Sequence, residues 1–376
     1  MKFKQRAIEL YQYFYLYFLK KKREKDLKEA RSLPSPVISV GNLTVGGSGK
    51  TPMVIAIAEE AKRLGLDVCI LSRGYKGRLK EPAVVSCRTG RLLDAIDCGD
   101  EPALMADKLY GVPVVIGKDR YKAGMYALQC FKKKPDIFLL DDGYQHWRLK
   151  RDLDILLISG INPFGNRRLF PFGPLREPLE DIKRAHIIVI TMADKCKNIS
   201  MLIDEIRLYA KTSSIYLANH RIKSIRRYMV DEHGKANFQD ELSPFELKGK
   251  RVFAFAGIGN PESFRMSLKD AGMEIAEFIT FRDHHLYSVC ELKELSDRAK
   301  ELNLPMITTE KDLIRAEGRL HPGEIYTLII EISIENRFFE EVFKNRGQKS
   351  EVRCQRPEIR GRISESKENF SSASDI

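Results

Sequence analysis

The chain has 376 residues, of which 43% are hydrophobic and 31% are charged. These are globular proportions: they exclude wholesale disorder and collagen-like architectures, and the length suits two ordinary domains of about 100–200 residues each. Lys and Arg number 64 against 52 Asp and Glu, a formal charge of +12. Such a charge attracts polyanions, so the expected ligands are nucleic acid, an anionic membrane or phosphorylated compounds.

The seven cysteines are widely spaced, without a CxxC pair or Cys and His at metal-ligand spacing. A scattered odd set is typical of reduced thiols in a cytosolic protein. The sequence contains no run of about 18 apolar residues, and its start lacks the small-residue cleavage site of a secretory signal. We therefore expect neither a membrane-spanning nor a secreted protein.

Residues 1–34 differ in composition from the rest of the chain, because an aromatic-rich stretch over 7–19 is followed by the basic run 20–23. The pattern predicts an amphipathic helix with a basic collar. Tyr favours the lipid headgroup boundary, and clustered Lys and Arg attract anionic lipid by about 1 kcal/mol each. From this segment alone, a helix lying on a membrane and a helix covering the core of the first domain are equally good interpretations.

Residues 35–214 alternate between short apolar strands and helices. Strands are predicted at 37–40, 67–71, 112–116, 136–140, 153–158 and 186–190, with helices near 50–64 and 119–132. Continuous apolar runs indicate strands buried on both faces, which is typical of a mostly parallel α/β sheet.

Residues 215–345 contain a second alternating series and predict a smaller α/β domain. The part before residue 248 is less readable; after it, strands are expected at 251–255, 274–280, 305–308 and 325–331, and helices at 261–271 and 290–302. The final segment, 346–376, is rich in Ser, Arg, Lys and Glu, and this composition predicts a disordered tail.

The strongest functional signal is the glycine-rich segment 41–51 between the first strand and the first helix of the sheet. Glycines let successive main-chain N–H groups turn toward phosphate oxygens. Lys50 is placed to reach the β- and γ-phosphates of a nucleotide and Thr51 to ligate Mg²⁺, while the helix N-terminus adds partial positive charge. The residues expected to bind the nucleotide are Thr44, Val45, Gly46, Gly47, Ser48, Gly49, Lys50 and Thr51. Thr44 stands where the general P-loop pattern has its first glycine.

Asp141 and Asp142 follow the strand predicted at 136–140. An acid at this place can hold Mg²⁺ directly or through water, although paired acids can also merely cap a strand end. Gln145 and His146 add polar groups at the same sheet edge, where ligands of open α/β sheets bind.

A series of short motifs then identifies a family. They are residues 41–52, Leu71-Ser72-Arg73-Gly74-Tyr75, Gly99-Asp100-Glu101-Pro102, Asp119-Arg120, Asp141-Asp142-Gly143-Tyr144-Gln145-His146, Pro174-Leu175-Arg176-Glu177-Pro178, Asp283-His284-His285 and Thr308-Thr309-Glu310-Lys311-Asp312. Together they closely resemble the tetraacyldisaccharide 4'-kinase family of lipid A biosynthesis, from about residue 35 to 317. A threonine instead of the first P-loop glycine, as at Thr44, is typical of the family that the sequence resembles.

The resemblance implies an ATP- and Mg²⁺-dependent kinase with a P-loop NTPase-like, mostly parallel sheet domain, a second, smaller α/β domain and an N-terminal amphipathic helix. The implied reaction transfers the γ-phosphoryl group of ATP to the 4'-hydroxyl of tetraacyldisaccharide 1-phosphate, giving the 1,4'-bisphosphorylated lipid A precursor (lipid IVA). It also implies a peripheral protein on the anionic cytoplasmic face of the bacterial inner membrane, without a nucleic-acid partner. With such an acceptor, the interfacial interpretation of residues 1–34 becomes the favoured one.

Three residues are the expected catalytic set: Lys50, Asp100 and His284. The last two match the family's acidic and histidine positions, and a carboxylate that orients an imidazole makes a better base than either group alone. Because they lie far apart in sequence, an interdomain cleft that closes on binding is expected. Two alternatives stay open: Asp100 as a helix N-cap or Mg²⁺-shell acid, and His284 as an exposed histidine at a helix start.

The resemblance also supplies candidate metal and acceptor ligands. Mg²⁺ is expected at Thr51 and Asp142, with Glu101 and Gln145 as outer ligands. Arg73, Arg120 and Arg176 suit phosphate recognition, because a guanidinium pairs bidentately with phosphate oxygens. Which of them meets ATP and which the lipid phosphate stays open, as does a purely structural salt bridge for any one. The expected acceptor-binding residues are Asn42, Arg73, Arg120, Asp141, His146 and Arg176.

A P-loop GTPase of the metallochaperone or signal-recognition type is the main alternative, because it shares the Gly-Gly-x-Gly-Lys-Thr loop. Two features argue against it. Val45 stands where several of those enzymes have a second lysine, and the guanine-reading [NT]KxD motif appears only as residues 191–194, without its lysine. A non-enzymatic, basic nucleic-acid- or membrane-binding protein is a further alternative, but no zinc finger or RNA-binding signature supports nucleic acid.

Overall fold

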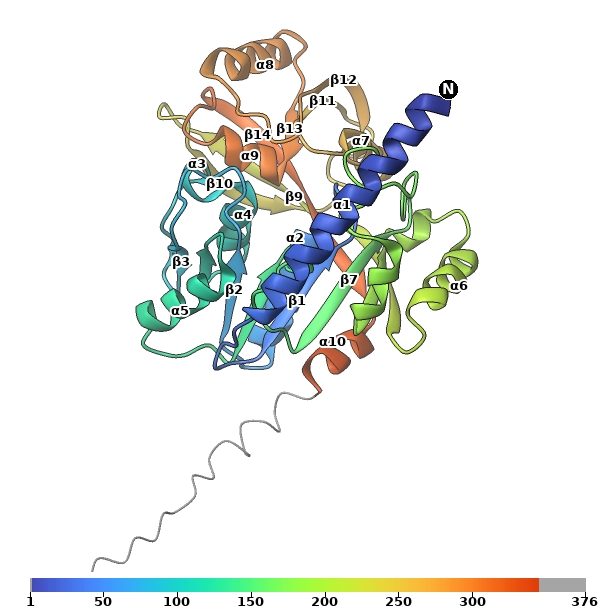
Figure 1. Cartoon of the computed structure of the whole chain (residues 1–376). Coiled ribbons are helices and arrows are strands. Elements are labelled where there is room, and N and C mark those ends of the chain that lie inside the picture. The colour runs from blue at the N-terminus through green and yellow to red at the C-terminus, as the bar shows by residue number, and fades with distance from the viewer. Residues whose placement is uncertain (1, 345–376) are drawn as a thin grey trace, which may run out of the picture.

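The computed structural model describes residues 2–344, so the tail predicted at 346–376 lies outside the described residues. One sheet runs through the molecule in the order β12-β11-β13-β14-β9-β8-β7-β1-β6-β2-β5-β3-β4, with β10 paired to β9 (Figure 1). Within residues 2–344, no helix combines the length and the apolar character needed to cross a bilayer.

The first unit is built on parallel strands whose side chains are buried on both faces, as the continuous apolar runs predicted. These strands are β1 (Val37–Asn42), β2 (Val68–Ser72), β5 (Val114–Ile116), β6 (Ile137–Asp141), β7 (Leu153–Ser159) and β8 (Ile187–Thr191). The short strands β3 (Ala83–Cys87) and β4 (Gly90–Arg91) form an antiparallel edge that is absent from the strands predicted from the sequence.

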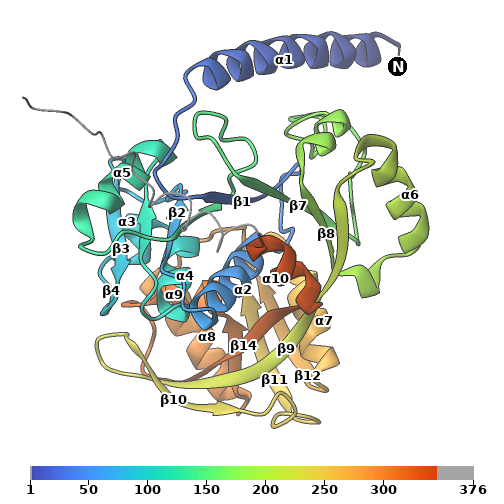
Figure 2. The same cartoon turned by 90° about the horizontal axis from the view of Figure 1, so that it is seen from below.

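Helices cover both faces of this sheet, because neighbouring strand residues point in opposite directions. Ile38 of β1 packs in the core formed with α2 (Lys50–Arg63), whereas Val37 packs in the core formed with α5 (Arg120–Cys130). Figure 2 shows α2 and α10 (Asn336–Phe343) on one side of β1 and β7, and α1 (Lys2–Lys28) on the other. The remaining helical elements of this unit are α3 (Ala95–Cys98), α4 (Asp100–Lys108), η1 (Leu179–Arg184), η2 (Ala193–Lys195) and α6 (Ile199–Tyr209).

The second unit repeats this layering at smaller size. Its parallel strands are β11 (Arg251–Ala256), β12 (Glu274–Thr280), β13 (Met306–Thr309) and β14 (Gly323–Ile334). Its helices are α7 (Pro261–Asp270), α8 (Val289–Glu301) and α9 (Glu310–Ala316). Phe264 of α7 lies in the core on one face of these strands, and Leu292 of α8 in the core on the other. The fold class predicted from the sequence is confirmed.

A long antiparallel ribbon joins the two units. β9 (Ser214–Val230) pairs in parallel with β8 over its first residues and antiparallel with β14 as far as Val230, while β10 (Ala236–Leu242) adds a hairpin. After β14 the chain returns to the first unit, where Phe338 of α10 is buried in the same core as α2. The sheet is therefore continuous across the predicted boundary at 214/215, and the assignment of residues 215–345 to one domain stays a prediction.

The N-terminal segment is a helix, and α1 turns one side toward the body of the protein. Tyr15 and Leu16 pack against the core beneath η1 and α6, and the buried Asp26 accepts a hydrogen bond from Arg148 at 2.7 Å. The opposite side carries exposed aromatic residues: Tyr11, Tyr13, Phe14, Tyr17 and Phe18. An apolar face thus remains uncovered on this helix.

Candidate active site

The glycine-rich segment forms the turn between β1 and α2. Gly49 has φ 79° at the N-cap of α2, a left-handed conformation in which glycine has no steric penalty. A Cβ at Gly46 or Gly47 would meet nothing within 4 Å, so the backbone here lines open space. The Thr191 hydroxyl of β8 donates to the Ser48 carbonyl at 3.1 Å and supports the turn from below. We call residues 44–51 the phosphate loop.

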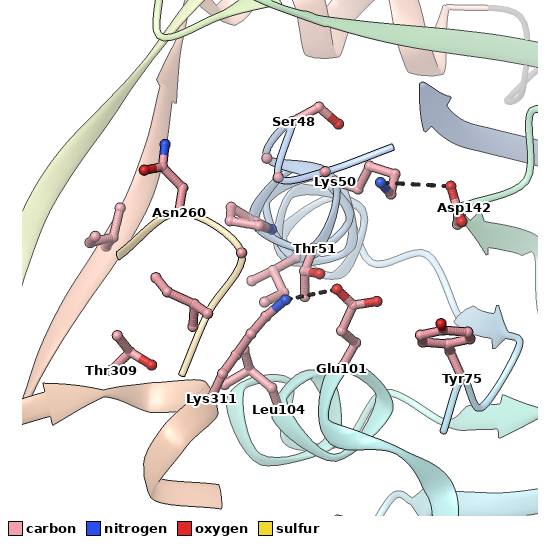
Figure 3. Close-up of a pocket in the computed structure, with 18 of the residues that line it drawn as sticks. Ser48, Lys50, Thr51, Tyr75, Glu101, Leu104, Asp142, Asn260, Thr309 and Lys311 are labelled. Atoms are coloured by element: carbon pink, nitrogen blue, oxygen red, sulfur yellow. Dashed lines mark hydrogen bonds and ion pairs between the residues drawn. The ribbon is translucent and has the colours of Figure 1, made fainter. Parts of the chain in front are cut away.

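Lys50 extends from the loop toward the end of β6 (Figure 3). Its Nζ lies 3.3 Å from Oδ1 of Asn42 and 3.7 Å from Oδ1 of Asp142. Asp142 adopts φ 50°, which turns the chain sharply after β6, and Nη1 of Arg176 donates to both of its oxygens, at 2.8 and 3.1 Å. Burial acts to raise the pKa of Asp142, but the charges of Lys50 and Arg176 outweigh it, so the pKa lies below its ordinary value.

Asp141 has a different environment from its neighbour. It is buried, and its Oδ2 accepts a hydrogen bond from the Ser72 hydroxyl at 3.0 Å, whereas its Oδ1 has no partner among the described residues. Burial, together with the charges of Glu101 and Asp142, raises the pKa of Asp141 to about 7. The buried Oδ1 of Asp141 is therefore available to accept a hydrogen bond from an additional donor or to bind a cation.

Asp100 and His284 meet although they come from different units. Nδ1 of His284 lies 2.9 Å from Oδ2 of Asp100, and the His284 main-chain N–H donates to the Gly257 carbonyl at 3.0 Å. Burial acts to raise the pKa of Asp100, but the hydrogen bond from His284 and the charges of Lys311 and Arg315 outweigh it and lower the pKa to about 2. Asp100 is thus an ionised acceptor for the imidazole.

The structure disfavours two of the alternative interpretations, namely Asp100 as a helix N-cap and His284 as an exposed histidine at a helix start. Asp100 is the first residue of α4, and the N-cap position belongs to Gly99. His284 has φ 58° in the loop before α8, whose own cap is Ser288, and its side chain is only 20% exposed.

Two cations from α9, to which the sequence motifs assigned no role, complete this charged interface. Nζ of Lys311 lies 2.7 Å from Oε1 of Glu101 (Figure 3), and Nε of Arg315 lies 3.2 Å from Oδ2 of Asp100. Their i, i+4 spacing places both on one face of α9. That spacing is visible in the sequence, but nothing in it indicates that this face meets α4.

A cavity of about 980 Å³ connects these groups. The phosphate loop, Glu101 and Asp142 line it from the first unit, and His284 and Lys311 line it from the second. The ring of Tyr75 meets His284 edge-on, with 5.7 Å between centroids, and Tyr15 and Lys22 of α1 border another part of the cavity.

The other predicted site residues divide into two groups. Arg73, Arg176 and Gln145 line the cavity, and the Gln145 amide donates to the Asn42 carbonyl at 2.9 Å. Arg120 and His146 are not among the lining residues.

Arg120 is buried, and its guanidinium donates to the carbonyls of Gly117, Lys118 and Asp141. The Arg120 main-chain N–H donates to Nε2 of His146, and burial, followed by the charge of Arg120, lowers the pKa of His146 to about 4. In this structure the side chains of Arg120 and His146 therefore bond to main-chain groups of the protein itself, including the Asp141 carbonyl.

The oxygen donors of the site suit a hard cation. Thr51, Glu101 and Asp142 present hydroxyl and carboxylate oxygens to the cavity. Asp141 precedes Asp142 in the sequence, and its buried Oδ1 has no partner among the described residues. Within residues 2–344, no group of three or more His, Cys, Asp or Glu side chains could hold a metal by itself. This donor set fits Mg²⁺, which usually binds through one or two carboxylates together with substrate phosphates.

Comparisons with known proteins match this chain to one family. The family model described as tetraacyldisaccharide-1-P 4'-kinase matches residues 9–348. A tetraacyldisaccharide 4'-kinase from Halothermothrix orenii is 39% identical over 317 residues, covering 79% of this chain and 80% of that protein. One from Aquifex aeolicus is 39% identical over 296 residues, covering 78% and 84%.

A solved structure supports the same assignment. It is LpxK from Aquifex aeolicus in complex with ATP, which superposes with a TM-score of 0.71 at 34% sequence identity and covers 91% of this chain and 98% of its own. The chain belongs to the tetraacyldisaccharide 4'-kinase family.

Proposed function

We propose that this protein transfers the γ-phosphoryl group of ATP to the 4'-hydroxyl of tetraacyldisaccharide 1-phosphate, producing the 1,4'-bisphosphorylated lipid A precursor. One observation carries the proposal: the phosphate loop of the first unit and His284, whose Nδ1 contacts Asp100, line the same cavity of about 980 Å³. A phosphoryl donor and an alcohol held in that cavity would meet between a phosphate cradle and a base.

ATP is assigned to the phosphate loop. Main-chain N–H groups of residues 44–51 and the N-terminus of α2 would hold the phosphates, and Lys50 would neutralise charge on the transferring group. The carboxylate of Asp142 at 3.7 Å and the Asn42 amide oxygen at 3.3 Å keep the Lys50 ammonium at the mouth of the loop.

Thr51 and Asp142 would hold Mg²⁺, with Glu101 and Gln145 further from it. When bound, the ion neutralises negative charge on the phosphoryl oxygens during transfer. Arg176 then has a supporting function as well, because its two hydrogen bonds fix the carboxylate of Asp142.

His284 is proposed as the base for the acceptor. Its Nδ1 donates to Asp100, which leaves Nε2 to accept the proton of the 4'-hydroxyl. The hydroxyl oxygen forms a bond to the γ-phosphorus as the bond to the β,γ-bridging oxygen breaks, so the proton goes to His284 and ADP leaves. Asp100 orients the ring and stabilises its charged form.

The acceptor is a lipid, and α1 is proposed to lie on an anionic inner-membrane surface. Five exposed aromatic residues on its outer side support this, together with the basic residues that follow them. Arg73 and Arg176, which line the cavity, are the candidates for contact with the phosphates of ATP and of the lipid.

The test is transfer of ³²P from γ-labelled ATP to tetraacyldisaccharide 1-phosphate in detergent micelles, with labelled GTP in a parallel reaction. We expect labelled lipid with ATP, and loss of most of it in Lys50→Ala, while Lys250→Ala, a lysine exposed outside the cavity, keeps it. Nucleotide hydrolysis without labelled lipid, or a preference for GTP, would contradict the proposal.

A further inference from the structure

The segment between β7 and η1 contains a small, well-braced loop with an aromatic tip. Phe170 and Phe172 are 51% and 39% exposed, whereas Leu169 and Leu175 beside them are buried in the core beneath α1. The Phe170 main-chain N–H donates to the Leu175 carbonyl at 2.8 Å, and the Asn166 amide donates to the Phe172 carbonyl at 2.8 Å. The two exposed rings therefore project from a fixed base.

This tip adjoins the outer side of α1. The rings of Phe172 and Tyr11 meet edge-to-face, with 5.3 Å between centroids. With 100° per residue, the exposed aromatic positions of α1 fall on one half of the helix and the buried positions on the other. Phe170 and Phe172 extend that aromatic half sideways, beyond the helix. The combined surface, which we call the aromatic face, consists of Tyr11, Tyr13, Phe14, Tyr17, Phe18, Phe170 and Phe172.

The charge beside the aromatic face selects its partner. Lys21, Lys25 and Lys28 are exposed and, by helical spacing, continue along the same side of α1 as Phe14 and Tyr17. Aromatic rings next to exposed lysines match the acyl–headgroup boundary of an anionic bilayer, where rings enter the lipid and ammonium groups meet phosphates.

The same loop is connected to the phosphate loop at its other end. Leu175 forms a β-bridge with Thr44, the Val45 N–H donates to the Pro174 carbonyl at 2.7 Å, and the Arg176 N–H donates to the Leu43 carbonyl at 2.7 Å. The next contact along the chain is the pair of hydrogen bonds from Arg176 to Asp142. A fixed path of a few residues thus leads from the aromatic tip to the nucleotide site.

We propose that Phe170 and Phe172 are a second membrane contact, which enters an anionic phospholipid bilayer beside α1 and sets the depth of the phosphate loop below the lipid surface. This inference rests on the proposed function, because it presupposes that α1 lies on the membrane. It adds a rigid contact from the body of the protein. Two separate contacts define an orientation toward the bilayer, which one helix alone does not.

The test uses the full chain and vesicles of phosphatidylethanolamine and phosphatidylglycerol. We expect the double variant Phe170→Ser/Phe172→Ser to bind these vesicles about tenfold more weakly than the wild type in a flotation assay. The matched control is Phe238→Ser/Phe245→Ser, which removes two exposed phenylalanines from the second unit and should bind like the wild type. Thermal melting of each variant verifies that it is folded.

A reporter variant tests insertion independently of affinity and of activity. The chain has one tryptophan, Trp147, which is 3% exposed. Emission of Phe170→Trp should shift to the blue on vesicle addition and be quenched by brominated acyl chains, whereas wild-type emission should change little. The inference is overturned if Phe170→Trp shows no shift and the Phe170→Ser/Phe172→Ser variant binds like the wild type.

Two further outcomes distinguish failure of the second membrane contact from failure of the membrane or kinase proposals. If Phe14→Ser/Phe18→Ser abolishes vesicle binding while Phe170→Ser/Phe172→Ser binds like the wild type, α1 is the sole contact and the depth-setting role of the loop is wrong, although the membrane proposal stands. If Phe170→Trp shifts only with micelles of tetraacyldisaccharide 1-phosphate and never with phospholipid, the tip contacts the acceptor's acyl chains and the bilayer inference fails. In either case, the kinase proposal is retained if the wild-type protein transfers ³²P from ATP to the acceptor in micelles.

Discussion

His284 and Asp100 are 184 positions apart in sequence, yet Nδ1 of the one lies 2.9 Å from Oδ2 of the other. The contact joins the loop before α8 to the first residue of α4, so it links the two units directly. Because it places an ionised carboxylate against an imidazole at the cavity wall, it supplies the geometry that a shared base requires.

Substitution of either member should therefore slow the chemical step. We expect Asp100→Asn and His284→Ala each to lower kcat by about 10²–10⁴-fold, a typical range for loss of a general base, with little change in the KM for ATP. The double variant should be scarcely slower than the worse single variant, because residues that act as a unit are not additive. Steady-state kinetics with micellar acceptor provide the measurement, and fully additive effects would argue for two independent roles.

Arg315 should act as a positioning residue for the same pair. Its side chain is 4% exposed, with Nε 3.2 Å from Oδ2 of Asp100, and its Nη1 donates to the Gly257 carbonyl, which also accepts the His284 N–H. It thereby holds both partners of His284 at once. We expect Arg315→Ala to lower kcat at least tenfold, with the KM for ATP nearly unchanged, and added guanidinium to restore part of the rate.

The control for this substitution is Arg298→Ala, which removes an exposed arginine of α8 that pairs with Glu277 and Glu301. It should keep the wild-type rate and gain nothing from guanidinium. A slow Arg315→Ala variant that guanidinium does not rescue, and whose melting temperature has collapsed, would mean that Arg315 has a general structural role.

Much of the first unit could be predicted from the sequence, for an identifiable reason. β1, β2, β6, β7 and β8 are buried on both faces, so each is a short apolar run bounded by polar residues, and the glycine-rich turn follows the first of them directly. The phosphate loop and the paired acids are local features as well. They need only a strand end and a few neighbouring residues.

The ribbon that joins the units could not be predicted in the same way. β9 exchanges a parallel neighbour for an antiparallel one along its length, and its 17 residues have neither a continuous apolar run nor a regular alternation in burial. Lys311 illustrates the same limit in the site, because its partner Glu101 lies in the other unit. For Arg120, a motif next to Asp119 suggested phosphate binding, but burial of the guanidinium against main-chain carbonyls depends on tertiary packing.

Asp141 should make stability depend on pH. Its folded pKa of about 7 exceeds the ordinary value near 3.9, so the folded protein retains a proton that the unfolded chain has lost. Folding stability attributable to this group therefore decreases as pH rises from about 4 to 7. Asn imitates the protonated form, so Asp141→Asn should melt roughly 2–4 °C above the wild type at pH 8 and close to it at pH 4. Thermal melts without nucleotide, in EDTA, measure the difference, and a gap that is constant across this range would mean that Asp141 does not titrate there.

Substitutions of two glycines in the glycine-rich segment 41–51 should separate an effect on folding from an effect on nucleotide binding. A Cβ on Gly41 would stand 2.6 Å from Cβ and 2.8 Å from the main-chain N of Tyr144, which is fully buried, so Gly41→Ala should lose about 1–3 kcal/mol of stability through overpacking. A Cβ on Gly47 would meet nothing within 4 Å, so Gly47→Ala should melt like the wild type. That methyl group would nevertheless obstruct phosphate at the loop, so Gly47→Ala should bind ATP about tenfold more weakly, by isothermal titration. Because the two substitutions are chemically identical, a shared loss of stability would show that the loop itself is strained, and unimpaired ATP binding by Gly47→Ala would place the phosphates elsewhere.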